Sequence, residues 1–164
     1  MPSVTSAVMR GTLEAIYTNG GNVTQNISRR PLRHFTNGNG ALQANRAYDT
    51  DDTPLTLTAS ATQTYNLSSL TDKLGNTITA TKIKGILIEH LPSSVATGGI
   101  TVGGGTGAVF GTKLVDFPLL PGEHIQLCLG SGYTVTATTA DKLRIINADS
   151  SNTATVRVTL LLSQ

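Results

Sequence analysis

The fold is decided by the closing stretch of the sequence, Thr153–Leu162, which reads TATVRVTLLL. From Ala154 onward every second residue is apolar, and the residues between them are mostly polar. A period of two residues places alternate side chains on opposite faces of a strand. The stretch therefore predicts a β-strand with one face in a hydrophobic core.

The same period recurs upstream, and turn residues punctuate it. Alternating stretches are Leu55–Ala59, Ile125–Leu129 and Tyr133–Ala137. A fourth stretch, Ile83–Leu91, is apolar on both faces around its centre, which favours a central strand covered on both sides. Turn signals such as Pro121–Gly122 and Gly130–Ser131–Gly132 separate the stretches, and no segment has a convincing helical period.

The composition agrees with a β-sheet protein. Charged residues make up only 13% of the chain, against about 25% in an average protein, and threonine takes much of their place. Short strands with regular punctuation predict an all-β fold, an antiparallel β-sandwich of jelly-roll type with about eight strands. An immunoglobulin-like sandwich is the alternative, but the chain has no tryptophan and no cysteine pair.

The first part of the chain differs from the rest in charge and in pattern. Residues 1–50 carry five arginines against Glu14 and Asp49, a net charge of +3, while the remainder carries −1. Asn-Gly pairs occur in this part, and the residues between them follow no sustained period. We therefore expect residues 1–52 to form a basic, extended or partly ordered N-terminal arm, and residues 53–164 to form the sandwich. The alternative is that the first part adds one or two strands to the same domain.

The arginines of the arm are the strongest electrostatic feature. Arginine in a mobile arm binds carboxylates or phosphates of a partner. The candidate partner contacts are Arg29, Arg30, Arg33, His34 and Arg46. Nucleic acid is not the expected partner, because aromatic rings for base stacking are not interleaved with the arginines. The alternative is that these arginines lie in a solvent-exposed loop and bind no partner.

No catalytic constellation is evident. Neighbouring residues of a strand face opposite sides, so Glu89 and His90 cannot serve one site, and Glu123 and His124 follow the same rule. We expect these four residues to be solvated at strand ends. The lone Cys128 has no evident base beside it. The sequence therefore predicts no enzyme, no cofactor and no metal site.

Two further motifs have simpler explanations than ligand binding. The glycine-rich run Gly98–Gly107 lacks the lysine of a phosphate loop and is better explained as hairpin ends flanking a short strand. The acidic group Asp49, Asp51 and Asp52 could bind calcium, but Thr53 and Pro54 follow it where a calcium loop needs further ligands and a glycine. We favour a hinge between arm and sandwich.

No apolar run approaches the ~20 residues of a membrane span, and no signal peptide is evident.

Several segments between residues 44 and 162 resemble virion proteins of tailed bacteriophages. The resemblance rests on Ala44–Tyr48, Leu55–Leu57, Ala59–Tyr65, Asn66–Asp72, Thr81–His90, Pro121–Gly122, Gly132–Ile145 and Thr153–Leu162. The segment Asn66–Asp72 followed by Thr81–His90 is similar to a family pattern in which "lDLs-lTD-G" precedes a strand of the form "kIK-i-iEn".

The resemblance implies a jelly-roll decoration or cement protein on a capsid with an HK97-type shell. Such a structural protein binds the major capsid protein across capsomer joints and associates with itself as a dimer or trimer. It implies a virion location, on the capsid surface, after synthesis in the host cytoplasm, and no membrane partner. The alternative is a tail or baseplate accessory module associated with receptor binding.

Overall fold

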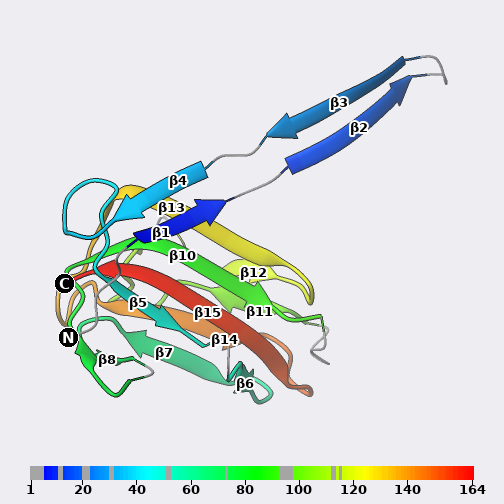
Figure 1. Cartoon of the computed structure of the whole chain (residues 1–164). Helices are drawn as coiled ribbons and strands as arrows, with labels where there is room; N and C mark the ends of the chain where they lie inside the picture. Colours follow the sequence, from blue (N-terminus) through cyan, green and yellow to red (C-terminus); the bar gives the residue numbers. More distant parts are fainter. Residues whose placement is uncertain are drawn as a thin grey trace.

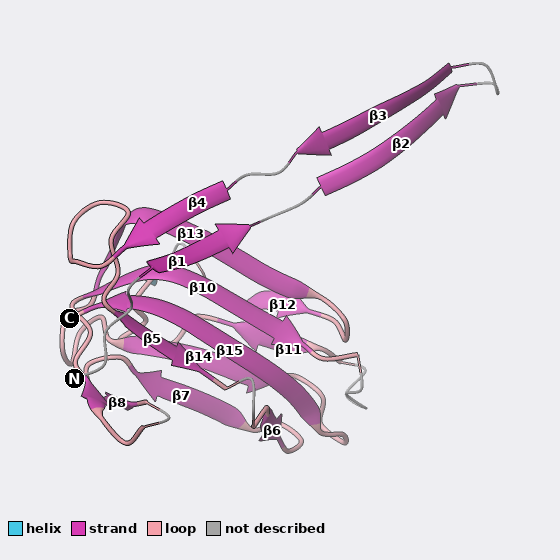
Figure 2. Cartoon of the chain, in the orientation of Figure 1, coloured by secondary structure: helices cyan, strands magenta, loops and turns pink. Residues whose placement is uncertain are grey.

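Strands make up all of the regular secondary structure in the described residues, which contain no α-helix (Figures 1 and 2). The computed structural model describes residues 6–10, 13–19, 23–29, 32–50, 53–72, 74–92, 98–111, 114 and 116–164, with side chains from His34 onward. Two antiparallel sheets lie over one another, and a two-stranded hairpin projects from them (Figure 1). The predicted all-β class is therefore confirmed.

The first sheet contains the closing strand of the chain at an inner position. Its order is β13 (His124–Thr134), β10 (Lys82–His90), β15 (Ala154–Ser163) and β5 (Arg46–Asp49). A short strand, β6 (Leu55–Leu57), pairs with the other half of β15, so β5 and β6 share one edge. The predicted central position of β10 is confirmed.

The second sheet covers the inner face of the first. Its order is β12 (Phe117–Leu119), β11 (Ile100–Val102), β14 (Lys142–Asn147) and β7 (Thr62–Asn66). A separate pair, β8 (Leu70–Thr71) with β9 (Thr77–Ile78), follows β7. At one side the rings of Tyr48 in β5 and Tyr65 in β7 meet edge to face, with centroids 5.6 Å apart, and join the two sheets.

The core lies between the sheets and follows the predicted alternation. In β15 the alternate residues from Ala154 to Leu162 are fully buried, whereas the residues between them are only half-buried. The facing sheet contributes Val102, Leu143 and Ile145 to the same cluster. Burial of each such aliphatic side chain stabilises the fold by about 1.5–3 kcal/mol, so the period-two pattern supplies most of the driving force.

The predicted turn at Gly130–Gly132 is wrong, because β13 runs through it. The ladder between β10 and β13 pairs Gly85 with Cys128 but Ile83 with Tyr133, so four residues of β13 lie opposite Lys84 alone. Glycine gives the backbone the freedom for such a bulge, and Gly132 has a positive φ of 79°. The two predicted strands are thus one strand with a wide bulge.

The predicted arm is a long hairpin that leaves the sandwich (Figure 1). Its inner part pairs β1 (Ser6–Arg10) with β4 (Leu32–Thr36), and its outer part pairs β2 (Leu13–Asn19) with β3 (Val23–Arg29). Four further residues of the predicted arm, Arg46–Asp49, form β5 and belong to the first sheet. The described residues of this segment are therefore mostly strands, and the division of the chain into an arm and a sandwich stays a prediction.

Candidate functional site

The predicted partner contacts fall on two different parts of the hairpin and its root. Arg29 ends β3 and Arg33 lies in β4, where the structure describes only their backbone, and Arg30 lies outside the described residues. His34 follows Arg33 in β4 and its side chain is exposed. Because β3 is followed in the chain by β4, Arg29, Arg33 and His34 lie near the middle of the projecting hairpin.

Arg46 has a different environment. It is half-buried, and its guanidinium donates to the side-chain oxygen of Gln164 at 3.0 Å and to the Asn45 carbonyl at 2.8 Å. The side chain of Asn45 also bonds the backbone of Gln164, donating to its carbonyl at 3.1 Å and accepting from its amide at 2.9 Å. Arg46 thus fastens the C-terminal residue to β5, and its use as a partner contact stays a prediction.

The hairpin is anchored to the outer face of the first sheet. Phe35 and Ala44 are fully buried and pack against Leu161 of β15. The loop between them is closed by backbone hydrogen bonds from Thr36 N to Leu42 O at 3.1 Å and from Ala44 N to Thr36 O at 2.9 Å. A further bond, from Leu42 N to Gly130 O at 2.8 Å, ties the loop to β13. We call residues 35–44 the arm root.

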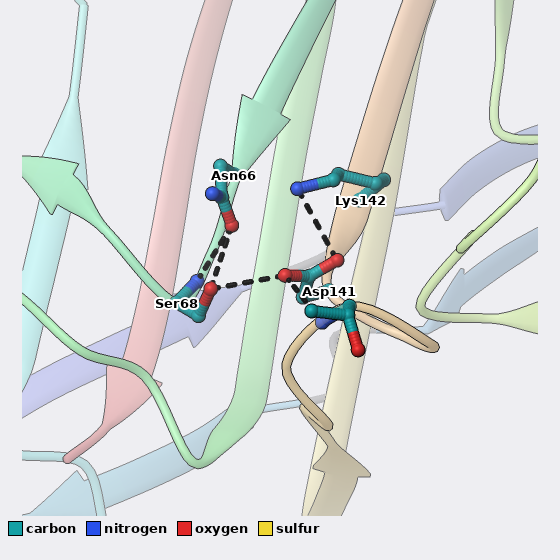
Figure 3. Close-up of polar contacts among 5 residues, drawn as sticks. Asn66, Ser68, Asp141 and Lys142 are labelled. Atoms are coloured by element: carbon teal, nitrogen blue, oxygen red, sulfur yellow. Dashed lines mark hydrogen bonds and ion pairs between the residues drawn. The ribbon is translucent and has the colours of Figure 1, made fainter.

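A polar cluster at one end of the second sheet is the nearest arrangement to a catalytic group (Figure 3). The Ser68 hydroxyl lies 2.7 Å from Asn66 Oδ1 and 3.0 Å from Asp141 Oδ2. The other carboxylate oxygen of Asp141 lies 3.3 Å from the Lys142 ammonium. The cluster joins the end of β7 to the start of β14, where Asn66 and Lys142 are paired in register.

The chemistry of this cluster suits a structural link better than proton abstraction. Burial acts to raise the pKa of Asp141, but the Thr138 amide, the Ser68 hydroxyl and the Lys142 ammonium together hold it below the usual value. A carboxylate with a lowered pKa is a poor general base for a serine hydroxyl. The cluster therefore joins the turn after β7 to the turn before β14.

The histidines and the cysteine do not meet in one site. His124 is exposed, as expected, but the prediction for His90 is wrong: its side chain is 1% exposed and its Nδ1 lies 3.0 Å from the Leu119 carbonyl. Cys128 is exposed on β13.

Within the described residues no group of three or more His, Cys, Asp or Glu side chains could hold a metal ion. Asp51 and Asp52, of the possible calcium or hinge segment, lie outside the described residues.

An open hollow of about 600 Å³ lies between β12 and the start of β13. Its lining includes Phe117, Glu123 and His124. Phe117 is 44% exposed, and Glu123 accepts a hydrogen bond from the Leu120 amide at 2.7 Å. The hollow presents the Phe117 ring beside two polar side chains and is an open depression, not an enclosed pocket.

No family model matches the chain, and comparisons with curated proteins and with solved structures return no match. The part of the chain that the structure describes holds no helix long and apolar enough to span a membrane.

Proposed function

We propose that this chain is a structural, non-enzymatic virion protein with a jelly-roll body, which cements the outside of a phage capsid through its projecting hairpin. The observation that carries the proposal is the combination of a two-sheet sandwich with a buried hydrophobic core and a basic two-stranded hairpin that leaves it (Figure 1). A protein built for attachment needs a rigid body and an element that reaches a neighbour. Both are present in one chain of 164 residues.

The strand order supports the jelly-roll assignment. If β5 and β6 count as one strand and the small β8–β9 pair is set aside, the two sheets read 6-3-8-1 and 5-4-7-2 in chain order. The antiparallel pairs are then nested, from β11–β12 at the centre to the pairing of β5 and β6 with β15 outside. A long hairpin wound around a core in this way is the arrangement of an eight-stranded jelly roll.

The charge of the hairpin supports an acidic protein partner. Residues 6–36 contain four arginines and one glutamate, a net charge of +3, while residues 37–164 carry −1. Arginine forms strong, bidentate hydrogen bonds with carboxylates, so the hairpin fits an acidic groove of a major capsid protein with an HK97-type shell. Self-association as a dimer or trimer would let several modest contacts act together at a capsomer joint. The proposed location is the capsid surface of the virion, after synthesis in the host cytoplasm.

The test is binding to purified, undecorated phage heads. We expect stoichiometric binding to mature heads and weak binding to procapsids, because a cement protein stabilises the geometry that it binds. The double variant Arg29→Glu/Arg33→Glu should bind at least about tenfold more weakly. Lys82→Glu, a charge reversal on a half-buried lysine of the sandwich, is the matched control and should bind as the wild type does. The absence of binding to both kinds of head would refute the proposal.

A tail or baseplate module is the second candidate, and the hollow beside Phe117 favours it. A partly exposed ring next to Glu123 and His124 is a surface on which a sugar could stack and form hydrogen bonds. Immunogold labelling of intact virions distinguishes the two candidates, because a cement protein labels the whole head and a tail module labels the tail tip.

A further inference from the structure

A buried lysine lies beneath the arm root. The Lys84 side chain is fully buried, and its Nζ donates to the carbonyl oxygens of Gly40 at 2.7 Å and of Ser131 at 3.2 Å. Lysine is almost never fully buried unless its ammonium is paired. Here backbone carbonyls from two separate segments receive it: Gly40 belongs to the arm root and Ser131 to β13.

The bulge in β13 makes room for this lysine. Gly132 has a positive φ of 79°, and a Cβ placed there would lie 2.9 Å from Cδ of Lys84 and 2.9 Å from the Ile83 carbonyl oxygen. A side chain at position 132 would therefore collide with the lysine stem. The glycines predicted to form a turn thus have a different role: the absence of a side chain at Gly132 leaves space for the Lys84 side chain to reach the arm root.

The other end of the contact is equally fixed. The Gly40 amide donates to Gln43 Oε1 at 2.7 Å, and the Gly40 carbonyl that Lys84 binds also accepts from the Gln43 amide at 3.2 Å, so Gln43 holds both peptides that flank Gly40. Leu42 donates to Gly130 O, one residue before Ser131. The ammonium and this backbone bond therefore hold the same loop against the same bulge at adjacent points.

We propose that Lys84 is a latch for the hairpin: its ammonium clamps the arm root onto the bulge of β13 and so fixes the direction in which the hairpin projects. Without the latch the arm root would keep its packing on Leu161 but would open more often, while the sandwich stays folded because its core cluster does not include Lys84. The latch couples the hairpin to the first sheet, so a partner that moves the hairpin must also break these contacts. The inference holds whether or not the partner of the hairpin is a capsid.

Burial of the Lys84 ammonium costs free energy, which its two carbonyl contacts must offset. Burial, together with the neighbouring charge of Lys82, lowers the pKa of Lys84. A buried charge that loses one of its acceptors is left incompletely solvated, so the two contacts break together rather than one at a time.

The test is hydrogen exchange of the full chain with the substitution Lys84→Met, which keeps a long unbranched side chain and removes the ammonium. We expect the amides of Thr36, Leu42 and Ala44 to exchange about tenfold faster or more, while the amides of β14 and β15 keep their protection within about twofold. Lys82→Met, on the same strand, is the matched control and should leave all of these rates unchanged. Unchanged exchange at the arm root in Lys84→Met would overturn the latch.

A second variant covers the case in which Lys84→Met unfolds the whole chain. Gln43→Ala removes the side chain that orients Gly40 and leaves the sandwich untouched. It should speed exchange of the Leu42 amide by a smaller factor, about threefold or more, with full protection in β15. If Gln43→Ala leaves that amide as protected as in the wild type, the loop does not depend on the orientation of Gly40 and the latch is refuted.

Discussion

Replacement of Asn147 by alanine removes a buried amide that joins three segments at the far end of the sandwich. Asn147 ends β14 and is 1% exposed. Its Nδ2 donates to the carbonyls of Leu57 at 3.2 Å, Thr58 at 3.0 Å and Asn152 at 2.8 Å, and its Oδ1 accepts from the Asp149 amide at 3.0 Å. The substitution therefore releases the end of β6 and the turn before β15 together.

The size of the effect follows from the number of bonds. An amide nitrogen has two N–H donors, so the three carbonyls share two hydrogen bonds, and the Oδ1 contact makes a third. At a net value of about 1 kcal/mol for each bond, the loss is about 3 kcal/mol. Carbonyls left without a donor in a buried site add about 1 kcal/mol or more. We expect Asn147→Ala to lower the free energy of unfolding by about 3–4 kcal/mol.

The assay is urea denaturation followed by circular dichroism, with Asn76→Ala as the control. The side chain of Asn76 is half-buried and donates to the Asp72 carboxylate oxygens, at 3.3 and 3.2 Å, within a turn. The control should lose less than about 1 kcal/mol. With a slope of about 2 kcal/mol per molar urea, Asn147→Ala should shift the midpoint down by about 1.5–2 M. A loss below about 1 kcal/mol, or one equal to that of Asn76→Ala, would refute the bond count.

Three further predictions concern the arm root, an acid-sensitive turn and a glycine. Phe35→Ala should weaken the arm root by about 2–4 kcal/mol, seen as faster hydrogen exchange there, with a smaller change in the urea midpoint of the sandwich. The Ser151 amide, above all, holds the pKa of Asp149 below its usual value. The ionised Asp149 therefore stabilises the fold fully above its unfolded-state pKa of about 4, and this stabilisation is lost as the pH falls further. Asp149→Asn should make the urea midpoint depend less on pH below about pH 4, and an unchanged pH dependence would contradict this. Gly103→Ala adds a Cβ that would collide with the Leu114 carbonyl oxygen at a φ of 97°, and it should lower the free energy of unfolding by about 2–4 kcal/mol in urea denaturation. Gly75→Ala, at a φ of 80° in open space, should cost about 1–2 kcal/mol.

The sequence predicted those parts of the fold that a buried face controls. In β15 one side of the strand meets the core, so the period of two is visible and the burial follows it. The continuous strand β13 was missed, because glycine residues mark turns and bulges alike and only the ladder with β10 separates the two. For the hairpin the sequence left an extended arm and added strands both open, because residues 1–50 follow no sustained period and the register is set by the pairing of β2 with β3.

The candidate site was harder to predict than the fold. The arginines at positions 29, 30 and 33 form a charged run in the sequence, and the structure places Arg29 and Arg33 in strands of the projecting hairpin. The sequence did not indicate that Lys84 is buried, since Lys82 and Glu89 lie in the same strand and Lys84 was one of several charged residues there. A buried lysine is recognisable only when the segment that covers it is known, and that segment, around Gly40, is 44 residues away in the chain.

The strand that decides the fold also determines how the hairpin is attached. Alternate residues of β15 fill the core, while Leu161, on the opposite face, packs against Phe35 and Ala44 of the arm root. The residue after this strand, Gln164, is held by Asn45 and Arg46, which directly follow the arm root. One strand thus carries both core residues of the sandwich and the packing site of the arm root, so the attachment of the hairpin depends on the same strand that decides the fold.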